Sequence, residues 1–396
     1  MELFELSITL ATLLSAYLVA HLLSHTNLFN YLNQRTRASS IDGLRGFLSI
    51  SVFICHFSIT YYWITDAIWK IPNNVIFYNY GKVSVAMFFM ISGYLFTKNH
   101  MDRSTFSILE FFESRIFRIY PLYILVVFIV FLIVLHETNY SLMCSSFELI
   151  KSTLRWILFL GCPINNYNDT RTIIAYVDWT LKYEWIFYLS FPLMIYLIKY
   201  FKVYFKISML LLGLYFFINP INFYYFNSKY FFLFIIGCFI TDKKFTSLKN
   251  RINFNSSYTS ALNLIILLSI LFYTETLSPI HLLFTSVSFF LFTQGNDLFG
   301  ILNSKPSKIL GEISYSIYLI HGLLLSLSFS HLMLINVRNF SFQEFLLIMP
   351  FFIIPIILLC VFTFICVENP MNKLGKRYIL SKKLSLYPKS LNRHEI

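Results

Sequence analysis

The sequence predicts an all-α membrane protein, a polytopic bundle of about eleven transmembrane helices. Of its 396 residues, 57% are hydrophobic and only 13% are charged, and the mean hydropathy is +0.66. Apolar runs close to the roughly 20 residues that a helix needs to cross a bilayer recur along the whole chain. This composition excludes a water-soluble globular protein.

The expected spans follow one another with short polar connections. They cover about 7–24, 44–64, 81–97, 120–135, 184–200, 207–218, 229–241, 259–273, 280–293, 310–330 and 345–367. Several are shorter than the ideal length, so ten or twelve spans also fit. The first span follows an acidic start without the basic flank of a signal peptide, so we expect a retained helix. The stretch 147–160 is interrupted by Lys151 and Arg155, and we expect it to lie at the interface or to be half inserted.

The basic residues predict the orientation of the bundle. With the N-terminus outside, 22 of the 31 Lys and Arg residues fall in the inner loops and the C-terminal tail, as the positive-inside rule requires. The net charge of +12 then follows from topology, so no nucleic acid partner is implied. The basic tail is expected to be cytoplasmic and to contact anionic lipid headgroups.

Arg45 and His56 are the most informative pair of residues. They lie eleven positions apart in one apolar run, which places them near one face of a helix and roughly 16 Å apart along its axis. Ionisable side chains are costly in a membrane unless they serve a function. A cation near the inner end suits an anionic cofactor, and a deeper neutral His suits proton or acyl transfer. The alternative is an end-anchoring Arg and a packed His.

A second pair of cations opens the span that begins near residue 120. Arg115 and Arg118 are one helical turn apart, and two guanidinium groups at that spacing can bind phosphates bidentately. Ordinary positive-inside anchoring would use the same residues. In the preceding span, Ser92 and Gly93 allow either a ligand or another helix to approach the backbone closely.

Two further segments carry polar groups at predicted membrane positions. Glu184 follows Trp179 and Tyr183 at the outer entry of a span, where its carboxylate could orient a sugar hydroxyl or a histidine, or complement the helix dipole. His321 is a second intramembrane His, in the same segment as Tyr315. Its role could be structural hydrogen bonding or catalysis. No cysteines show metal-type spacing, and a disulfide between Cys144 and Cys162 is open.

Taken in order, these segments resemble the acyltransferase-3 family of integral membrane acyltransferases, from about Ile41 to Pro370. The resemblance rests on Asp-x-Leu-Arg-Gly with Arg-x10-His (Asp42, Arg45, His56), Phe-Phe-x-x-Ser-Gly-Tyr-Leu (Phe88 to Leu95), Arg-x-x-Arg (Arg115, Arg118), Trp-Thr-Leu-x-x-Glu (Trp179 to Glu184) and Ser-Tyr-x-x-Tyr-Leu-x-His (Ser314 to His321). It implies a membrane domain over 34–378, an additional N-terminal helix over 1–33, and a tail over 379–396.

The resemblance implies transfer of an acyl group, usually acetyl from cytoplasmic acetyl-CoA, to a hydroxyl of a surface glycan such as O-antigen or capsule, or of a lipid-linked glycan. Peptidoglycan and a small-molecule glycoside are the alternative acceptors. It places the chain in a bacterial inner membrane and implies no metal. It implies three groups of site residues. The expected roles are catalysis by His56, Glu184 and Asp42; CoA binding by Arg45, Arg115, Arg118, Ser92 and Gly93; and substrate contact or support by Trp179, Tyr183, Tyr315 and His321. Whether His56 is a base or an acyl carrier stays open.

The geometry expected from these roles is one interior path. We expect a tunnel from the three arginines to His56, with Glu184 at or near its outer end, because unpaired ionisable groups need a hydrated or ligand-filled cavity. A transporter or flippase of a lipid-linked glycan or anion would use buried charges in a similar way, although no internal repeat is evident in the sequence.

Overall fold

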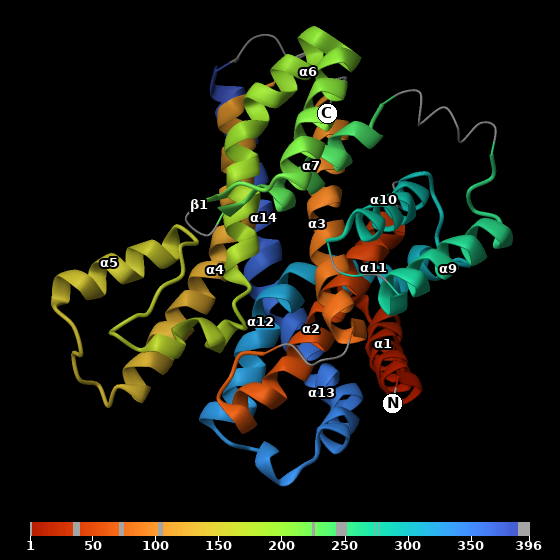
Figure 1. Ribbon diagram of the computed structural model, residues 1–396. Helices are drawn as coiled ribbons and strands as arrows, with labels where there is room; N and C mark the ends of the chain where they lie inside the picture. The colour runs from red at the N-terminus through yellow and green to blue at the C-terminus, as the bar shows by residue number, and fades with distance from the viewer. Residues whose placement is uncertain are drawn as a thin grey trace.

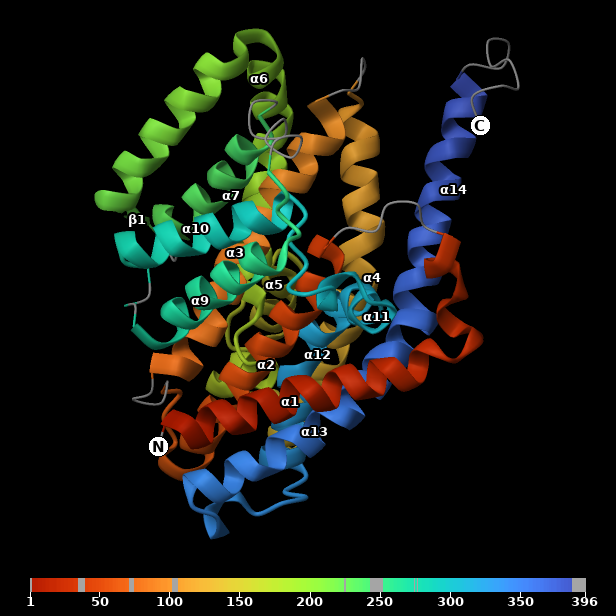
Figure 2. The same ribbon diagram turned by 90° about the vertical axis from the view of Figure 1, so that its right-hand side faces the viewer.

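The computed structural model describes residues 2–34, 40–70, 75–101, 106–223, 226–242, 252–273, 275 and 277–386. Helices dominate it, as predicted (Figures 1 and 2). The α-helices are α1 (Glu2–Ser24), α2 (Ser40–Asp66), α3 (Val75–Met101), α4 (Ile108–Glu137), α5 (Ser146–Ile157), α6 (Asp178–Ile218), α7 (Ser228–Ile240), α9 (Ser257–Tyr273), α10 (Pro279–Thr293), α11 (Lys305–Glu312), α12 (Ser314–Ser326), α13 (Phe342–Thr363) and α14 (Asn369–Leu386).

Short elements complete the chain. One antiparallel pair joins β1 (Asn222–Phe223) to β2 (Phe226–Asn227). The 3₁₀ turns are Asn27–Gln34, Asn168–Ile174, Ile301–Asn303 and Val337–Asn339, and the π-helical turns are Leu327–His331 and Phe364–Glu368.

The number of long spans differs from the expected eleven. Within the described residues, six helices are long and apolar enough to cross a membrane, or up to seven if the bent pair α11–α12 is one span. The runs 184–200 and 207–218 both belong to α6, which is interrupted at Lys202, where φ is 53°. The run 310–330 is broken by a bend of 63° between α11 and α12. Three others, α7, α9 and α10, are apolar but short. The hydropathy pattern located apolar segments but did not resolve which of them cross.

Helix α2 lies at the centre of the bundle and packs against α3, α11 and α12. It approaches α11 closely because both helices carry glycine at the contact. A Cβ at Gly311 would lie 1.9 Å from the carbonyl oxygen of Asp42, and a Cβ at Gly46 would lie 2.5 Å from Cβ of Leu310. This contact fixes the start of α2, and with it Arg45, against the α11–α12 bend. Helix α1 runs beside α13 and α11 (Figure 2).

Two segments lie at the edge of the bundle. Helix α5, in the stretch expected at the interface, projects from the other helices, and Trp156 is its buried residue (Figure 1). Its neighbours Cys144 and Cys162 are both free thiols. Helix α14 packs along α4, and the boundary expected between residues 378 and 379 falls inside it. The start of the expected tail is therefore a docked helix.

Candidate active site

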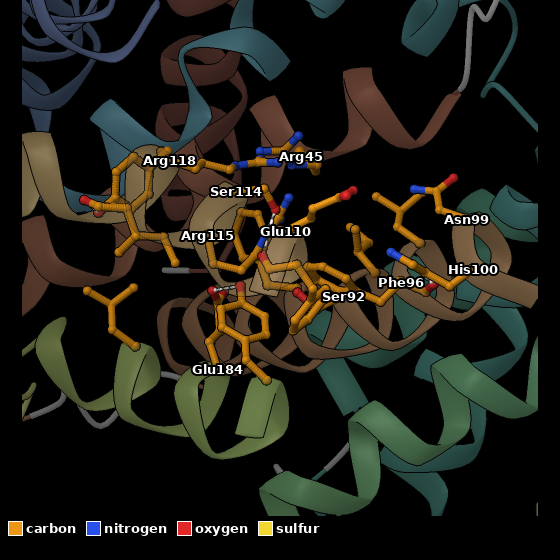
Figure 3. A pocket seen from close by; sticks show the side chains of 18 of the residues that line it. Arg45, Ser92, Phe96, Asn99, His100, Glu110, Ser114, Arg115, Arg118 and Glu184 are labelled. Carbon is orange, nitrogen blue, oxygen red and sulfur yellow. Dashed lines mark hydrogen bonds between the residues drawn. The ribbon is translucent and has the colours of Figure 1, made fainter. Parts of the chain in front are cut away.

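A cavity of about 1270 Å³ opens between α2, α3, α4, α6, α12 and α14. The three predicted arginines meet in it, although Arg45 comes from α2 and Arg115 and Arg118 come from α4 (Figure 3). Helix α4 begins at a Ser107 N-cap, which accepts a hydrogen bond from the Glu110 backbone N–H. That cap fixes where α4 begins, and Arg115 and Arg118, in its second and third turns, both line the cavity.

Two of the three arginines are held by neutral groups. Arg45 Nη2 donates to Ser314 Oγ at 3.1 Å, and Arg115 Nε donates to Ser114 Oγ at 3.1 Å. The Arg115 guanidinium also lies 4.8 Å from the centre of the Phe96 ring, a cation–π contact. Among the ion pairs of the described residues, none joins a carboxylate to any of the three arginines. Three guanidinium groups in one cavity therefore keep hydrogen-bond donors for an anionic ligand.

Glu184 does not lie where the sequence suggested. We expected it at the outer end of a path, but it lines the same cavity as the arginines, one turn before Tyr188, whose hydroxyl donates to Glu184 Oε2 at 2.6 Å (Figure 3). The reason is that α6 already begins at Asp178, so Glu184 lies almost two turns inside the helix. Its carboxylate belongs with the cationic cavity.

Two other expected site residues lie elsewhere. A Cβ at Gly93 would be 2.1 Å from the carbonyl oxygen of Phe234 in α7, so Gly93 serves helix packing, while Ser92 faces the cavity. Asp42 lies fourteen residues before His56 in α2, which separates them by roughly 21 Å. It lines an adjoining cavity of about 620 Å³ together with Arg45. Asp42 therefore cannot act on the same atoms as His56.

His56 and His321 form one hydrogen-bonded pair. His56 Nδ1 lies 2.8 Å from His321 Nε2, and the two rings stack with centres 5.1 Å apart and planes at 9°. His321 is fully buried, and its Nδ1 lies 2.8 Å from the carbonyl oxygen of Ile317. The sequence placed both histidines in the membrane but gave no sign that they touch, since α2 and α12 are distant in the chain.

The hydrogen bonds of this pair fix its protons. A carbonyl oxygen only accepts, so His321 Nδ1 carries a hydrogen and donates it to Ile317. In the neutral imidazole His321 Nε2 is then an acceptor, and His56 Nδ1 donates to it. His56 Nε2 is left with a lone pair. This is the arrangement that a general base or a nucleophile needs.

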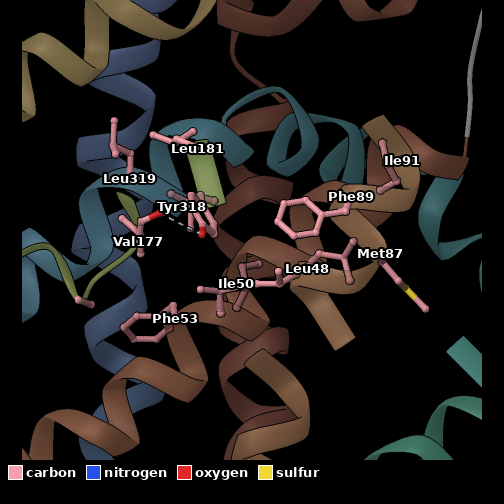
Figure 4. Close-up of a cluster of buried hydrophobic side chains, with 14 of the residues drawn as sticks. Leu48, Ile50, Phe53, Met87, Phe89, Ile91, Val177, Leu181, Tyr318 and Leu319 are labelled. Atoms are coloured by element: carbon pink, nitrogen blue, oxygen red, sulfur yellow. Dashed lines mark hydrogen bonds between the residues drawn. The ribbon is translucent and has the colours of Figure 1, made fainter. Parts of the chain in front are cut away.

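The expected open tunnel to His56 is not present. Tyr318 lines the cavity and also belongs to the buried apolar cluster with Leu181 and Val177 (Figure 4). The Tyr318 hydroxyl lies 2.6 Å from Thr180 Oγ1, and its ring centre is 6.3 Å from that of His321. His56 is not among the residues that line the cavity. Tyr318 therefore touches both the arginine cavity and the histidine pair.

The remaining predicted residues are placed as follows. Tyr315 lines the cavity and donates to the Ile119 carbonyl at 2.8 Å. Tyr183 accepts from the Asn227 backbone N–H at 2.6 Å, and Trp179 packs on Tyr230 with ring centres 4.8 Å apart. Both support the contact between α6 and α7 and do not lie against the histidines. Sequence reasoning missed the position of Tyr318, although it stands in the same motif as His321.

The family model described as an acyltransferase domain, Acyl_transf_3, matches residues 39–365, which is more than half of the chain. The chain belongs to the acyltransferase-3 family. No curated protein and no solved structure matches it. The resemblance predicted from the five motifs is confirmed, and the family makes this chain a membrane acyltransferase. Helices α1 and α14 lie outside the matched residues of this acyltransferase-3 protein.

Proposed function

We propose that this protein transfers an acetyl group from acetyl-CoA on the cytoplasmic side of a bacterial inner membrane to a hydroxyl of a cell-surface or lipid-linked glycan. The observation that carries the proposal is the spatial order of three features. A basic cavity is followed by the Tyr318 side chain, and Tyr318 is followed by the histidine pair, in which His56 Nε2 carries a lone pair. A donor with phosphates at one end and a thioester at the other matches that order.

The cavity suits the donor in size and charge. Its volume of about 1270 Å³ exceeds the roughly 300–1,000 Å³ of common ligand pockets, and CoA is a long ligand. Arg45, Arg115 and Arg118 offer planar donors for the diphosphate. The positive-inside prediction puts their loops in the cytoplasm, where acetyl-CoA is found.

The reaction uses His56 as a general base. His56 Nε2 takes the proton of the acceptor hydroxyl while that oxygen forms a bond to the thioester carbonyl carbon. The tetrahedral intermediate collapses, the C–S bond breaks, and the CoA thiolate leaves with the proton that His56 returns. His321, whose acceptor nitrogen faces His56 Nδ1–H, stabilises the imidazolium that forms in between. If His56 first carries the acetyl group itself, the same lone pair attacks the thioester.

Transfer requires that Tyr318 moves. Its side chain lines the cavity and contacts His321, held by the bond to Thr180. A rotamer change of this side chain would join the two spaces. Until that change the thioester could not reach His56, so water activated by His56 could not reach the thioester either.

Aromatic side chains beside His56 favour a glycan acceptor. The Trp69 ring centre lies 6.1 Å from that of His56, and it also contacts Trp63 at 5.9 Å and Tyr176 at 5.2 Å. All three are partly exposed. The apolar faces of sugar rings pack on aromatic rings of this kind, and these residues lie at the end of α2 that the topology places outside.

The test compares surface glycan O-acetylation by mass spectrometry in cells without the protein, with it, and with His56→Ala at matched membrane levels. We expect acetyl groups only with the parent. A purified sample supplied with labelled acetyl-CoA and the extracted glycan should transfer the label. If the glycan crosses the membrane normally but gains no acetyl group, the protein is a transporter and the proposal is wrong.

A further inference from the structure

Helix α14 closes one side of the arginine cavity, although the sequence suggested that its residues lie in or next to a lipid-bound tail. Lys376, Ile379, Leu380 and Lys383 of α14 line the cavity. The helix is held in place by ion pairs to the start of α4, Lys382 Nζ to Glu113 Oε1 at 2.7 Å and Lys383 Nζ to Glu110 Oε2 at 3.2 Å. These contacts make α14 a fixed wall of the cavity.

Close packing along the same interface supports that placement. A Cβ at Gly375 would lie 2.6 Å from the Phe117 Cβ, and the Phe117 and Tyr378 ring centres are 5.9 Å apart. Lys376 follows the buried Gly375 directly, so the position of its backbone is set by α4. A lysine on a packed helix wall is a better defined ligand group than one in a tail.

Lys376 differs from the other lysine of this wall. Lys383 is paired with Glu110, whereas the ion pairs and hydrogen bonds of the described residues include none for Lys376. Lys376 also lines both the main cavity and the adjoining one, as Arg45, Arg115 and Arg118 do. It is exposed, while the three arginines are half-buried. The cations therefore form a series from the interior to the solvent, with Lys376 at its outer end.

We infer that Lys376 binds the 3′-phosphate of the acyl-CoA donor. This inference rests on the proposed function. In CoA the groups follow the order thioester, pantetheine, diphosphate and 3′-phosphoadenosine. With the thioester toward Tyr318 and the diphosphate at the arginines, the 3′-phosphate is the outermost charge of the ligand. Lysine suits a terminal phosphate monoester, because its ammonium is a compact point charge with freely rotating donors.

The consequence is a donor preference that the arginines alone would not produce. Acetyl-CoA and acetyl-3′-dephospho-CoA share the thioester, the pantetheine and the diphosphate. Only contacts to the 3′-phosphate can discriminate between them.

The experiment measures kcat and KM for both donors with the purified full-length protein in lipid nanodiscs. It uses the parent, Lys376→Gln and a matched control, Arg377→Gln, which removes one charge from the next residue of α14, a residue that lines neither cavity. We expect Lys376→Gln to raise the KM for acetyl-CoA on the order of tenfold, with kcat unchanged. Its KM for the dephospho donor should equal that of the parent. Arg377→Gln should match the parent for both donors.

Three outcomes would overturn the inference: a parent KM that is equal for the two donors, a Lys376→Gln effect of the same size on both, or the same effect from Arg377→Gln. A parent that transfers acetyl groups from neither donor would instead refute the proposed function. Far-ultraviolet circular dichroism and a size-exclusion profile identical to the parent's are required of each variant. A Lys376→Arg variant adds a check on folding, since it should restore most of the preference for acetyl-CoA.

Discussion

The arginine cavity and the histidine pair, which the proposed reaction would use together, differ in exposure and in charge. The cavity is large, and no ion pair among the described residues joins its three arginines to a carboxylate. In the histidine pair, His321 is fully buried with both ring nitrogens in hydrogen bonds, while His56 is half-buried and uses only its Nδ1. The cavity is arranged to bind an anion. The histidine pair is arranged to hold one lone pair in a defined direction.

This difference assigns donor binding to the arginine cavity and the chemical step to the histidine pair. Arginines can keep their charge at a wet cavity surface, so the donor's phosphates can be recognised without desolvating the whole site. A base needs a known tautomer, and the chain supplies it through a carbonyl oxygen and a second imidazole. Among the described residues whose rings contact His321, Tyr318 is the only one that also lines the cavity, with ring centres 6.3 Å apart. Changes in the cavity should therefore alter KM, and changes in the histidine pair kcat.

The largest effect is expected from His56→Ala. Loss of a general base lowers rates by roughly 10²–10⁴-fold, and loss of an acyl carrier abolishes the route. We expect no detectable glycan acetylation, while acetyl-CoA still binds with the parent's affinity, because the arginine cavity is untouched. Binding is checked by isothermal titration of the purified variant. Near-normal acetylation would remove His56 from the mechanism and leave His321 as the next candidate.

His321→Ala should have the second largest effect. It removes the acceptor for His56 Nδ1–H. His56 still has its reactive Nε2, but its tautomer is no longer fixed by that hydrogen bond. A hydrogen bond to a charged group is worth about 1.5–3 kcal/mol, which corresponds to roughly 10- to 150-fold in rate. We expect kcat to fall by about that factor, with an unchanged KM for acetyl-CoA.

His321→Gln is the matched control for that effect. Its side-chain oxygen can accept the same hydrogen bond from His56, so it should recover more activity than Ala at equal expression. If the two variants are equally impaired, His321 acts through packing with Phe53 and not through the proton arrangement.

In the cavity, the double change Arg115→Lys and Arg118→Lys keeps the charge but removes the bidentate geometry. We expect the KM for acetyl-CoA to rise about tenfold with kcat and membrane insertion unchanged. This variant separates phosphate recognition from anchoring at the membrane edge, because both residue types serve the second purpose. Kinetics like the parent's would show that the pair is only an anchor.

Sequence reasoning reached the components of the arginine cavity and of the histidine pair but not their arrangement. Helical spacing placed Arg45 and His56 in one helix, because the 3.6-residue period is a local property. It could not bring His321 to His56, since that contact depends on how α12 packs on α2 after the bend at Ile313. It put Glu184 at the wrong end of the path, because the start of α6 was set too late in the chain.

The sequence pattern also could not predict whether an open tunnel joins the arginines to His56. A tunnel was expected because buried charges need solvation, and the cavity at the arginines fits that argument. His56 is instead stabilised by a hydrogen bond to the His321 imidazole, and the expectation of a tunnel did not consider such a partner. Gly93 shows the same limit, since a small residue permits close approach without saying whether a ligand or, as here, Phe234 approaches.

The smallest expected effect concerns the residue that touches both the cavity and the histidine pair. Tyr318→Phe keeps the ring but removes the hydroxyl that bonds Thr180 at 2.6 Å. A neutral hydrogen bond is worth about 0.5–1.5 kcal/mol, so the ring should leave its closed position more easily by a factor of roughly 2 to 10. If movement of Tyr318 limits the reaction, kcat rises within that range while the KM for acetyl-CoA stays constant.

Easier movement of the Tyr318 ring should also speed the hydrolysis of acetyl-CoA in the absence of a glycan. Release of the free CoA thiol, followed with a colorimetric reagent, measures this hydrolysis. Thr180→Val, which removes the other partner of the same bond, is the matched variant and should produce the same two changes. A lower kcat in both variants would mean that the hydroxyl takes part in the chemistry, and the view of Tyr318 as a barrier between binding and transfer would be wrong.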